Sequence, residues 1–283
     1  SDQGGRGDGV QIMVQNGYAY VGHMFSGGFT VLDVRDPRAP QPVNFVAAPP
    51  HTWSLHLQAH ENLLLVINGV DIYDPTLQIA KADYYNQPFA DTFGNQQRAF
   101  AAGLRVYDIA QPAQPREIGF MPVEGFGLHR IWYVGGRYAY ASALLDGYTD
   151  AIFLVIDLAD PTHPQEVGRW WIPGMWRAGG EAPTWEAAGR RYALHHAIIA
   201  GDTAYGSWRD GGLTLLDLHD RAHPELIAHR NWSPPFGGGT HTSLPLPDRQ
   251  LVIVADEAIA DHCADQVKYT WVVDVRAPSN PVT

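Results

Sequence analysis

Cysteine is almost absent from this chain of 283 residues, in which Cys263 is the single copy. One cysteine excludes an internal disulfide. Basic residues are also scarce, because 19 lysines and arginines stand against 30 aspartates and glutamates and give a formal net charge of −11. Proteins that bind the nucleic-acid backbone need basic patches, so we expect no nucleic-acid partner.

Long apolar runs are missing as well. No stretch reaches the roughly 18 consecutive apolar residues of a membrane-spanning helix, so we expect no membrane partner. Residues 1–8 are polar and rich in glycine, and they lack the apolar core of a signal segment. These features favour a cytoplasmic protein, although a signal peptide removed during maturation would leave no trace here.

Glycine, proline and hydrophobic residues are plentiful. The 29 glycines and 21 prolines are spread along the chain, which indicates many turns and not a disordered tail. Hydrophobic residues make up 45% of the sequence, which is enough for a large core in a chain of this length.

One short phrase, a β-rich strand that ends in aspartate, recurs five times. Its copies end at Asp33, Asp108, Asp157, Asp217 and Asp274. A Pro-x-x-Pro turn follows most copies, as at Pro37 and Pro40, whereas the fourth copy keeps only Pro224. Proline fixes φ near −65° and aspartate can bond the backbone that follows it. We therefore predict a strand-ending turn after each copy.

A hairpin precedes each copy of the phrase, and Gly135-Gly136 is one of its tight turns. Each unit therefore has four strands, A to D, and the phrase is strand C. Four-stranded units repeated at this interval, lengthened by loop insertions, are typical of a β-propeller. The alternative is a β-sandwich with irregular strands, which is disfavoured because a sandwich does not repeat its phrase. We predict an all-β propeller with five units in this chain.

The phrases at residues 30–33 (Thr-Val-Leu-Asp) and 154–157 (Leu-Val-Ile-Asp), with the Asp-Pro-x-x-Pro turn, resemble the LVIVD-repeat β-propeller family. The resemblance covers nearly the whole chain and implies the fold more strongly than an activity. Family members continue for further blades, whereas the last unit here stops at residues 281–283, inside its fourth strand. The resemblance thus implies a single propeller domain over residues 1–283, truncated in its last blade and part of a seven-bladed ring. A ring that closes with five blades is the alternative.

Long connections occur at residues 69–102, 174–193 and 257–268. In a propeller, the D-to-A connections and the B-to-C loops lie on one face, and all three segments are of these kinds. Long ordered loops in compact domains are usually lids or binding loops, so we expect them on one face, above a pocket on the axis. Aromatic residues in the long loops could wall a pocket for an aromatic or apolar small-molecule substrate, and anchoring of the loops is their alternative role: Tyr84, Tyr85, Trp176, Trp185 and Trp232.

Four histidines from four successive units stand at or near the start of an A strand: His56, His129, His195 and His241. Equivalent A-strand positions converge on the axis of a ring, and neutral imidazole is the commonest nitrogen ligand of Zn, Cu and Fe. We therefore predict one transition-metal ion, Fe, Cu, Zn or Mn, bound by these four residues. A polar, water-filled channel is the alternative, and His196 is an alternative ligand to His195. The arrangement is similar, by analogy, to selenium-binding proteins and carotenoid oxygenases, which are seven-bladed propellers that hold an axial metal with histidines.

Four charged residues are candidates for catalysis near this cavity. Asp210 and Glu257 stand at B-strand ends, Arg209 could pair with an anionic substrate, and Glu181 lies in a long loop. Turn capping before glycine is the alternative role for Asp210. The sequence favours a metal-dependent enzyme acting on a small organic substrate, by oxidative cleavage or by Lewis-acid lyase, isomerase or hydrolase chemistry. A non-catalytic propeller that binds a protein partner through its loop-rich face is the alternative.

Overall fold

A computed structural model describes residues 5–74, 76, 99–186, 189–260, 262 and 264–283. Two compact units are present. The first contains the described residues up to 76 together with 99–140 and 156–166, and the second contains 141–155 and the described residues from 167 onward. Cys263, Tyr84, Tyr85 and most of the segment 69–102 lie outside the described residues. No helix in the described part of the chain is long and apolar enough to cross a membrane.

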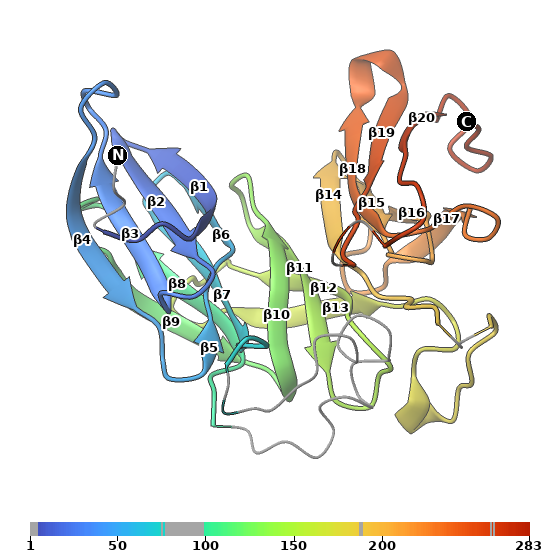
Figure 1. The fold of residues 1–283 in the computed structure, drawn as a ribbon, viewed down its shortest axis with the longest axis horizontal. Coiled ribbons are helices and arrows are strands. Elements are labelled where there is room, and N and C mark those ends of the chain that lie inside the picture. The colour runs from blue at the N-terminus through green and yellow to red at the C-terminus, as the bar shows by residue number, and fades with distance from the viewer. Residues whose placement is uncertain (1–4, 75, 77–98, 187–188, 261, 263) are drawn as a thin grey trace. The chain divides into compact units, whose positions relative to one another are not determined.

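The first sheet of the first unit is a four-stranded antiparallel meander. Its strands lie side by side in chain order (Figure 1): β1 (Gly9–Gln15), β2 (Tyr18–His23), β3 (Gly28–Asp33) and β4 (Gln41–Ala47). Asn16 and Gly17, both with positive φ, form the tight turn between β1 and β2.

The second sheet of this unit repeats the pattern with a broken first strand. Its strands are β5 (Thr52–Trp53), β6 (Leu57–His60), β7 (Leu63–Val70), β8 (Gly103–Asp108) and β9 (Arg116–Pro122). Both β5 and β6 pair with β7, which pairs with β8, and β8 pairs with β9. The two sheets share one hydrophobic core, in which buried residues such as Tyr20, Phe29 and Leu64 pack together. Removal of this apolar surface from water is the main force that holds the sheets together.

A third set of strands follows: β10 (Gly125–Trp132), β11 (Tyr138–Leu145), β12 (Ile152–Asp157) and β13 (Gln165–Trp170). The division between the two units passes through this set. Within the first unit, β10 meets β7 where Gly127 lies opposite Gly69.

The second unit contains the last two sheets. The fourth set runs in the order β14 (His196–Ala200), β15 (Thr203–Ser207), β16 (Leu213–Asp217) and β17 (Glu225–Arg230). The fifth set contains β18 (Thr240–Leu246), β19 (Leu251–Asp256) and β20 (Thr270–Asp274), and a bridge joins Asp274 to Val282. Residues such as Leu215 and Val254 form a common core between these two sheets. Two 3-10 turns, η2 (Arg177–Gly179) and η3 (Pro247–Arg249), lie in the connections.

The aspartate that ends each phrase forms the predicted turn. In all five copies, its side chain accepts a hydrogen bond from the backbone N–H two residues later, at 2.8–3.1 Å. The repeated antiparallel sheets with the phrase as third strand are also confirmed in the first, second, fourth and fifth sets. The single domain over residues 1–283 and the common face of the three long loops stay predictions.

Candidate metal centre

Three potential metal ligands come together in the second unit. His195 directly precedes β14, His241 is the second residue of β18, and Glu257 directly follows β19. One ligand atom from each of these residues lies within 4.8 Å of the others. Glu257 was a candidate for catalysis in the sequence, and the structure places its carboxylate within the same group as two of the four predicted histidines.

The two imidazoles of this group are oriented through their Nδ1 atoms. His195 Nδ1 lies 3.0 Å from the carbonyl oxygen of His241, and His241 Nδ1 lies 2.8 Å from Thr242 Oγ1. A carbonyl oxygen only accepts, so the Nδ1 of His195 carries the proton and its Nε2 keeps a lone pair in the neutral ring. Metal-bound histidines in proteins almost always have such a partner on the other ring nitrogen.

The rings themselves lie against each other, with centroids 3.8 Å apart and an interplanar angle of 29°. His195 is buried, whereas the side chain of His241 is 24% exposed. His196 is the next residue along the strand, and successive strand residues point to opposite faces. Of these two adjacent histidines, His195 is therefore the one whose ring joins His241.

Arg209 fixes the carboxylate of Glu257. Its guanidinium forms an ion pair with Glu257 Oε2, while Glu257 Oε1 lies 3.5 Å from His241 Nε2. The backbone of Arg209, in the left-handed region at φ +44°, exchanges two hydrogen bonds with Thr240 at 2.8 and 3.0 Å. Arg209, in the connection between β15 and β16, thus joins the fourth set to β18 and holds Glu257 beside His241.

The carboxylate of Asp210 organises backbone near this group. It accepts hydrogen bonds from the N–H of Arg191 at 2.7 Å and of Gly239 at 3.2 Å. The carbonyl of Gly239 in turn accepts a hydrogen bond from Glu257 N at 2.8 Å. These contacts favour a positioning role for Asp210 over direct acid–base chemistry.

The carboxylate of Glu181 likewise holds the backbone of its own loop. Its carboxylate accepts hydrogen bonds from Gly174 N, Trp176 N and Trp171 Nε1 at 2.7–3.2 Å. Partial burial raises the pKa of Glu181, but these hydrogen bonds outweigh it and lower the pKa below its ordinary value. The structure therefore places Glu181 in a loop anchor and not in the His195–His241–Glu257 group.

The other two predicted ligands form a pair in the first unit. His56 is buried in the break between β5 and β6, and its ring lies perpendicular to that of His129 with centroids 5.3 Å apart. His56 Nδ1 lies 3.2 Å from both Gln11 Oε1 and a guanidinium nitrogen of Arg130. Because the two histidine pairs belong to different units, the binding of one ion by all four stays a prediction.

The described loop tryptophans pack against other aromatic rings. Trp176 stacks on Tyr148, and Trp185 stacks on Tyr192 with ring centroids 4.1 Å apart. Trp232 is buried and lies beside Trp271. These contacts anchor the loops of the second unit.

Solved structures of the same architecture identify the class of fold. A protein from Lactobacillus plantarum is similar over 97% of this chain and 69% of its own, with a TM-score of 0.64 and 14% identity. A periplasmic gluconolactonase from Pseudomonas aeruginosa matches over 94% and 69%, with a TM-score of 0.57 and 15% identity. A β-propeller domain from Myceliophteria thermophila matches over 93% and 70%, with a TM-score of 0.50 and 11% identity. The chain is therefore an all-β protein with the β-propeller fold.

Two segments of the sequence also match a known repeat. The model of the LVIVD repeat matches residues 6–46 and 131–171, so this chain carries LVIVD repeats, as its phrases indicated. No curated protein matches the sequence. The low identities to the solved structures leave the reaction, if the protein has one, to be inferred from the site.

Proposed function

We propose that this protein is a metal-dependent enzyme that acts on a small organic substrate. The observation that supports it best is the His195–His241–Glu257 group, with ligand atoms within 4.8 Å of one another. The ring of His195 is in the tautomer whose Nε2 carries the lone pair, because Nδ1 donates to a carbonyl oxygen. His56 and His129 are proposed to complete the site.

Two imidazoles and a carboxylate are a donor set suited to catalytic metals. This set occurs in zinc hydrolases and in non-haem iron oxygenases, and in both it leaves positions open for water or substrate. We propose one ion of Fe, Cu, Zn or Mn, which when bound would polarise a carbonyl or activate water. In this chain, Arg209 holds Glu257 in place, and Asp210 holds the backbone that leads to His241.

Hydrolysis is our first choice among the reaction classes. The gluconolactonase among the similar folds supports it, by an analogy of fold only. Oxidative cleavage is the second choice, because the same donor set serves iron oxygenases. The two differ in the metal that they use and in whether the reaction consumes dioxygen.

Metal analysis of untagged protein tests this proposal. We expect about one ion per chain in the wild type and a large loss in His241→Ala and Glu257→Gln. His223→Ala is the matched control, because His223 is an exposed histidine of the same unit whose ring pairs with Asp220, outside the His195–His241–Glu257 group. It should keep the metal.

A protein that carries no metal, or variants that all retain it equally, would refute the metal centre. If metal removal abolished every hydrolytic and oxidative activity found with a panel of small esters, lactones and olefins, the enzymatic role would be supported. Activity that is unchanged after metal removal would instead favour the non-catalytic propeller that binds a protein partner.

A further inference from the structure

Four aromatic rings of the second unit lie in contact with one another. The ring of Trp271, in β20, lies 5.0 Å from that of Phe236 and 5.2 Å from that of Tyr269 between centroids. The ring of Trp232 lies 5.0 Å from that of Trp271. Phe236 also meets Tyr269 edge to face, at 5.3 Å and an interplanar angle of 77°. Aromatic pairs favour this geometry, so the four rings support each other and form what we call the aromatic platform.

One half of the aromatic platform is buried and the other half is exposed. Trp232 is 7% exposed and belongs to the core between the last two sheets, and Trp271 packs against that core. Phe236 and Tyr269 are each 40% exposed. Single exposed apolar residues are common in proteins, whereas exposed rings that touch each other and rest on a buried core form a continuous apolar surface. Such a surface is typical of a binding site.

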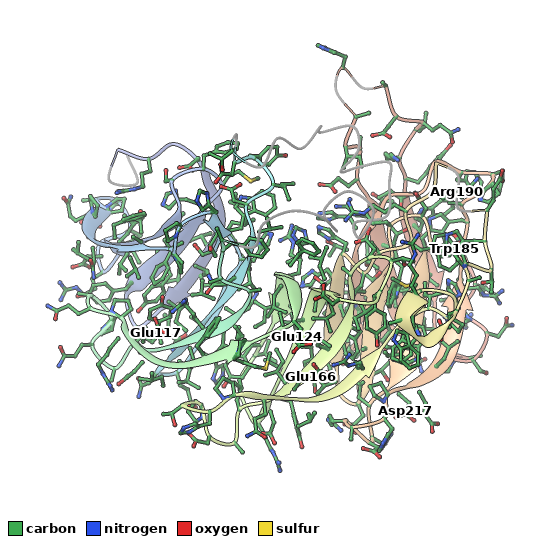
Figure 2. All side chains as sticks on the ribbon, turned by 90° about the horizontal axis from the view of Figure 1, so that it is seen from below. Glu117, Glu124, Glu166, Trp185, Arg190 and Asp217 are labelled. Carbon is green, nitrogen blue, oxygen red and sulfur yellow. The ribbon has the colours of Figure 1, made fainter. Side chains whose placement is uncertain are left out.

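A different arrangement holds the aromatic residues of another long connection. Trp185, labelled in Figure 2, lies in the connection that precedes β14, and its ring stacks flat on Tyr192 with an interplanar angle of 3°. Each ring of that pair covers a face of the other, so the pair anchors its own loop. The two outer rings of the aromatic platform instead meet edge to face and remain open to a ligand.

Asp256 joins the aromatic platform to the proposed metal centre. Its Oδ2 accepts a hydrogen bond from Trp271 Nε1 at 2.9 Å, and its Oδ1 accepts one from Thr240 Oγ1 at 3.2 Å. Thr240 directly precedes His241 in the chain, and Asp256 itself directly precedes Glu257. One carboxylate therefore fixes the platform relative to two of the proposed metal ligands.

The strand order sets the distance between the platform and these ligands. Tyr269 directly precedes β20, and its carbonyl oxygen accepts a hydrogen bond from Asp256 N at 3.0 Å, beside Glu257 at the end of β19. β19 lies between β20 and β18, the strand of His241. Neighbouring strands lie about 4.7–4.9 Å apart, so the backbone of Tyr269 is about 5 Å from the strand of Glu257 and about 10 Å from that of His241. A small organic molecule can span this distance.

Backbone contacts hold the two outer rings in place. Lys268, which directly precedes Tyr269, donates hydrogen bonds from Nζ to the carbonyl oxygens of Gly237 and Gly238 at 2.9 and 3.2 Å. Phe236 directly precedes these glycines, and its own N–H donates to a carbonyl oxygen four residues earlier at 3.0 Å. A ligand would therefore meet a preformed surface and would lose little affinity to the ordering of these loops.

We propose that the aromatic platform binds an aromatic or flat apolar part of the substrate, while the reacting group of the same molecule is held at the His195–His241–Glu257 group. This inference rests on the proposed function and specifies its substrate class as a small molecule whose apolar ring lies about 5–10 Å from the group that reacts. Phe236 and Tyr269 determine the specificity, and Asp256 positions the platform beside the ligands.

Isothermal titration calorimetry of the untagged, full chain tests the platform with two hydroxamates as probes. A hydroxamate binds a metal ion through its oxygen atoms. Acetohydroxamate carries no ring, whereas phenylbutanohydroxamate carries a phenyl group on a short aliphatic chain. We expect the second probe to bind about tenfold more tightly than the first, because its ring is buried against the platform. This advantage should fall below about threefold in Phe236→Ala and in Tyr269→Ala, while the affinity for acetohydroxamate stays unchanged.

Two further variants serve as controls. Tyr269→Phe keeps the ring and should keep the advantage of the phenyl probe. Phe25→Ala removes an exposed phenylalanine that belongs to the first unit, so it should bind both probes as the wild type does. Trp232 and Trp271 are left unchanged, because they pack in or against the core. Urea unfolding verifies that each variant is folded.

Equal affinity of the wild type for the two hydroxamates would overturn the proposal, and so would an advantage that survives in both alanine variants. A change in the oligomeric state of Phe236→Ala, measured by light scattering, with unchanged affinity for both probes would identify a protein contact and would also overturn it. Metal content distinguishes a failure of the platform from a failure of the proposed function. If the wild type carried no metal, the proposed function would fail, and the platform would be judged by phenylbutanohydroxamate alone, whose binding must still weaken in Phe236→Ala.

Discussion

Replacement of Gly103 by alanine tests the strand packing within a blade. Gly103 begins β8 with φ of +147°, and a Cβ placed there would lie 1.9 Å from the carbonyl oxygen of Met121. That oxygen belongs to β9, which is paired with β8 at this point. The glycines that precede the phrase in the first and fourth sets, Gly28 and Gly212, approach their own fourth strands in the same way.

The expected loss of unfolding free energy in Gly103→Ala has two parts. A non-glycine residue in this part of φ/ψ space costs about 1–3 kcal/mol. The strand end must also move away from the new methyl group, and the loss of one net hydrogen bond costs about 0.5–1.5 kcal/mol. Together they predict that Gly103→Ala lowers the free energy of unfolding by about 1.5–4.5 kcal/mol.

Two glycines of the same unit serve as controls. Gly136 has φ of +80° but no atom within 4 Å of an added Cβ, so Gly136→Ala should cost only about 1–2 kcal/mol of left-handed strain. Gly7 has neither a positive φ nor a close neighbour, so Gly7→Ala should be nearly neutral. Urea unfolding followed by tryptophan fluorescence gives the three values. If Gly103→Ala were no worse than Gly136→Ala, the close approach of β8 and β9 would be refuted.

Three further predictions concern titratable side chains that are buried or hydrogen-bonded. Asp150→Ala leaves Arg191 buried without its partner and should cost about 3–5 kcal/mol in urea unfolding, whereas Asp150→Leu combined with Arg191→Met should cost clearly less. Partial burial raises the pKa of Asp8, but hydrogen bonds, chiefly from Ser26, outweigh it and hold the pKa well below its ordinary value. The stability that Asp8 contributes is therefore present above the unfolded pKa of about 3.9 and is lost as the pH falls through the folded pKa. The difference in melting temperature between the wild type and Asp8→Asn should accordingly narrow below about pH 4. Burial raises the pKa of Tyr107 to about 12. The stability that the neutral Tyr107 side chain contributes is therefore present below the unfolded pKa of about 10 and is lost as the pH rises through the folded pKa. An alkaline absorbance titration of Tyr107→Phe should accordingly lack one late-titrating tyrosine.

The local parts of the fold could be predicted from the sequence. The aspartate turns depend on a bond between residues two positions apart, such as Asp108 Oδ1 and Ala110 N, so the repeated phrase contains all the information they need. The break between β5 and β6 could not be predicted. There Gln11, from the first sheet, accepts a hydrogen bond from Leu57 N, and a contact 46 residues away in sequence leaves no local pattern.

The candidate site was only partly visible in the sequence. Equivalent positions in the repeats identified His195 and His241, and Glu257 was found from its position at the end of a B strand. The same reasoning also selected Glu181, because an acidic residue in a long loop looks alike whether it faces a substrate or the N–H groups of its own loop.

X-ray absorption spectroscopy of the untagged protein, as purified, tests the central claim most directly. We predict a transition-metal edge whose extended fine structure shows nitrogen and oxygen neighbours at about 2.0–2.2 Å, with the outer-shell scattering of at least two imidazoles. This scattering should fall in His241→Ala and remain in His223→Ala. The absence of a metal edge, or a metal surrounded by oxygen atoms without imidazole scattering, would contradict the metal centre.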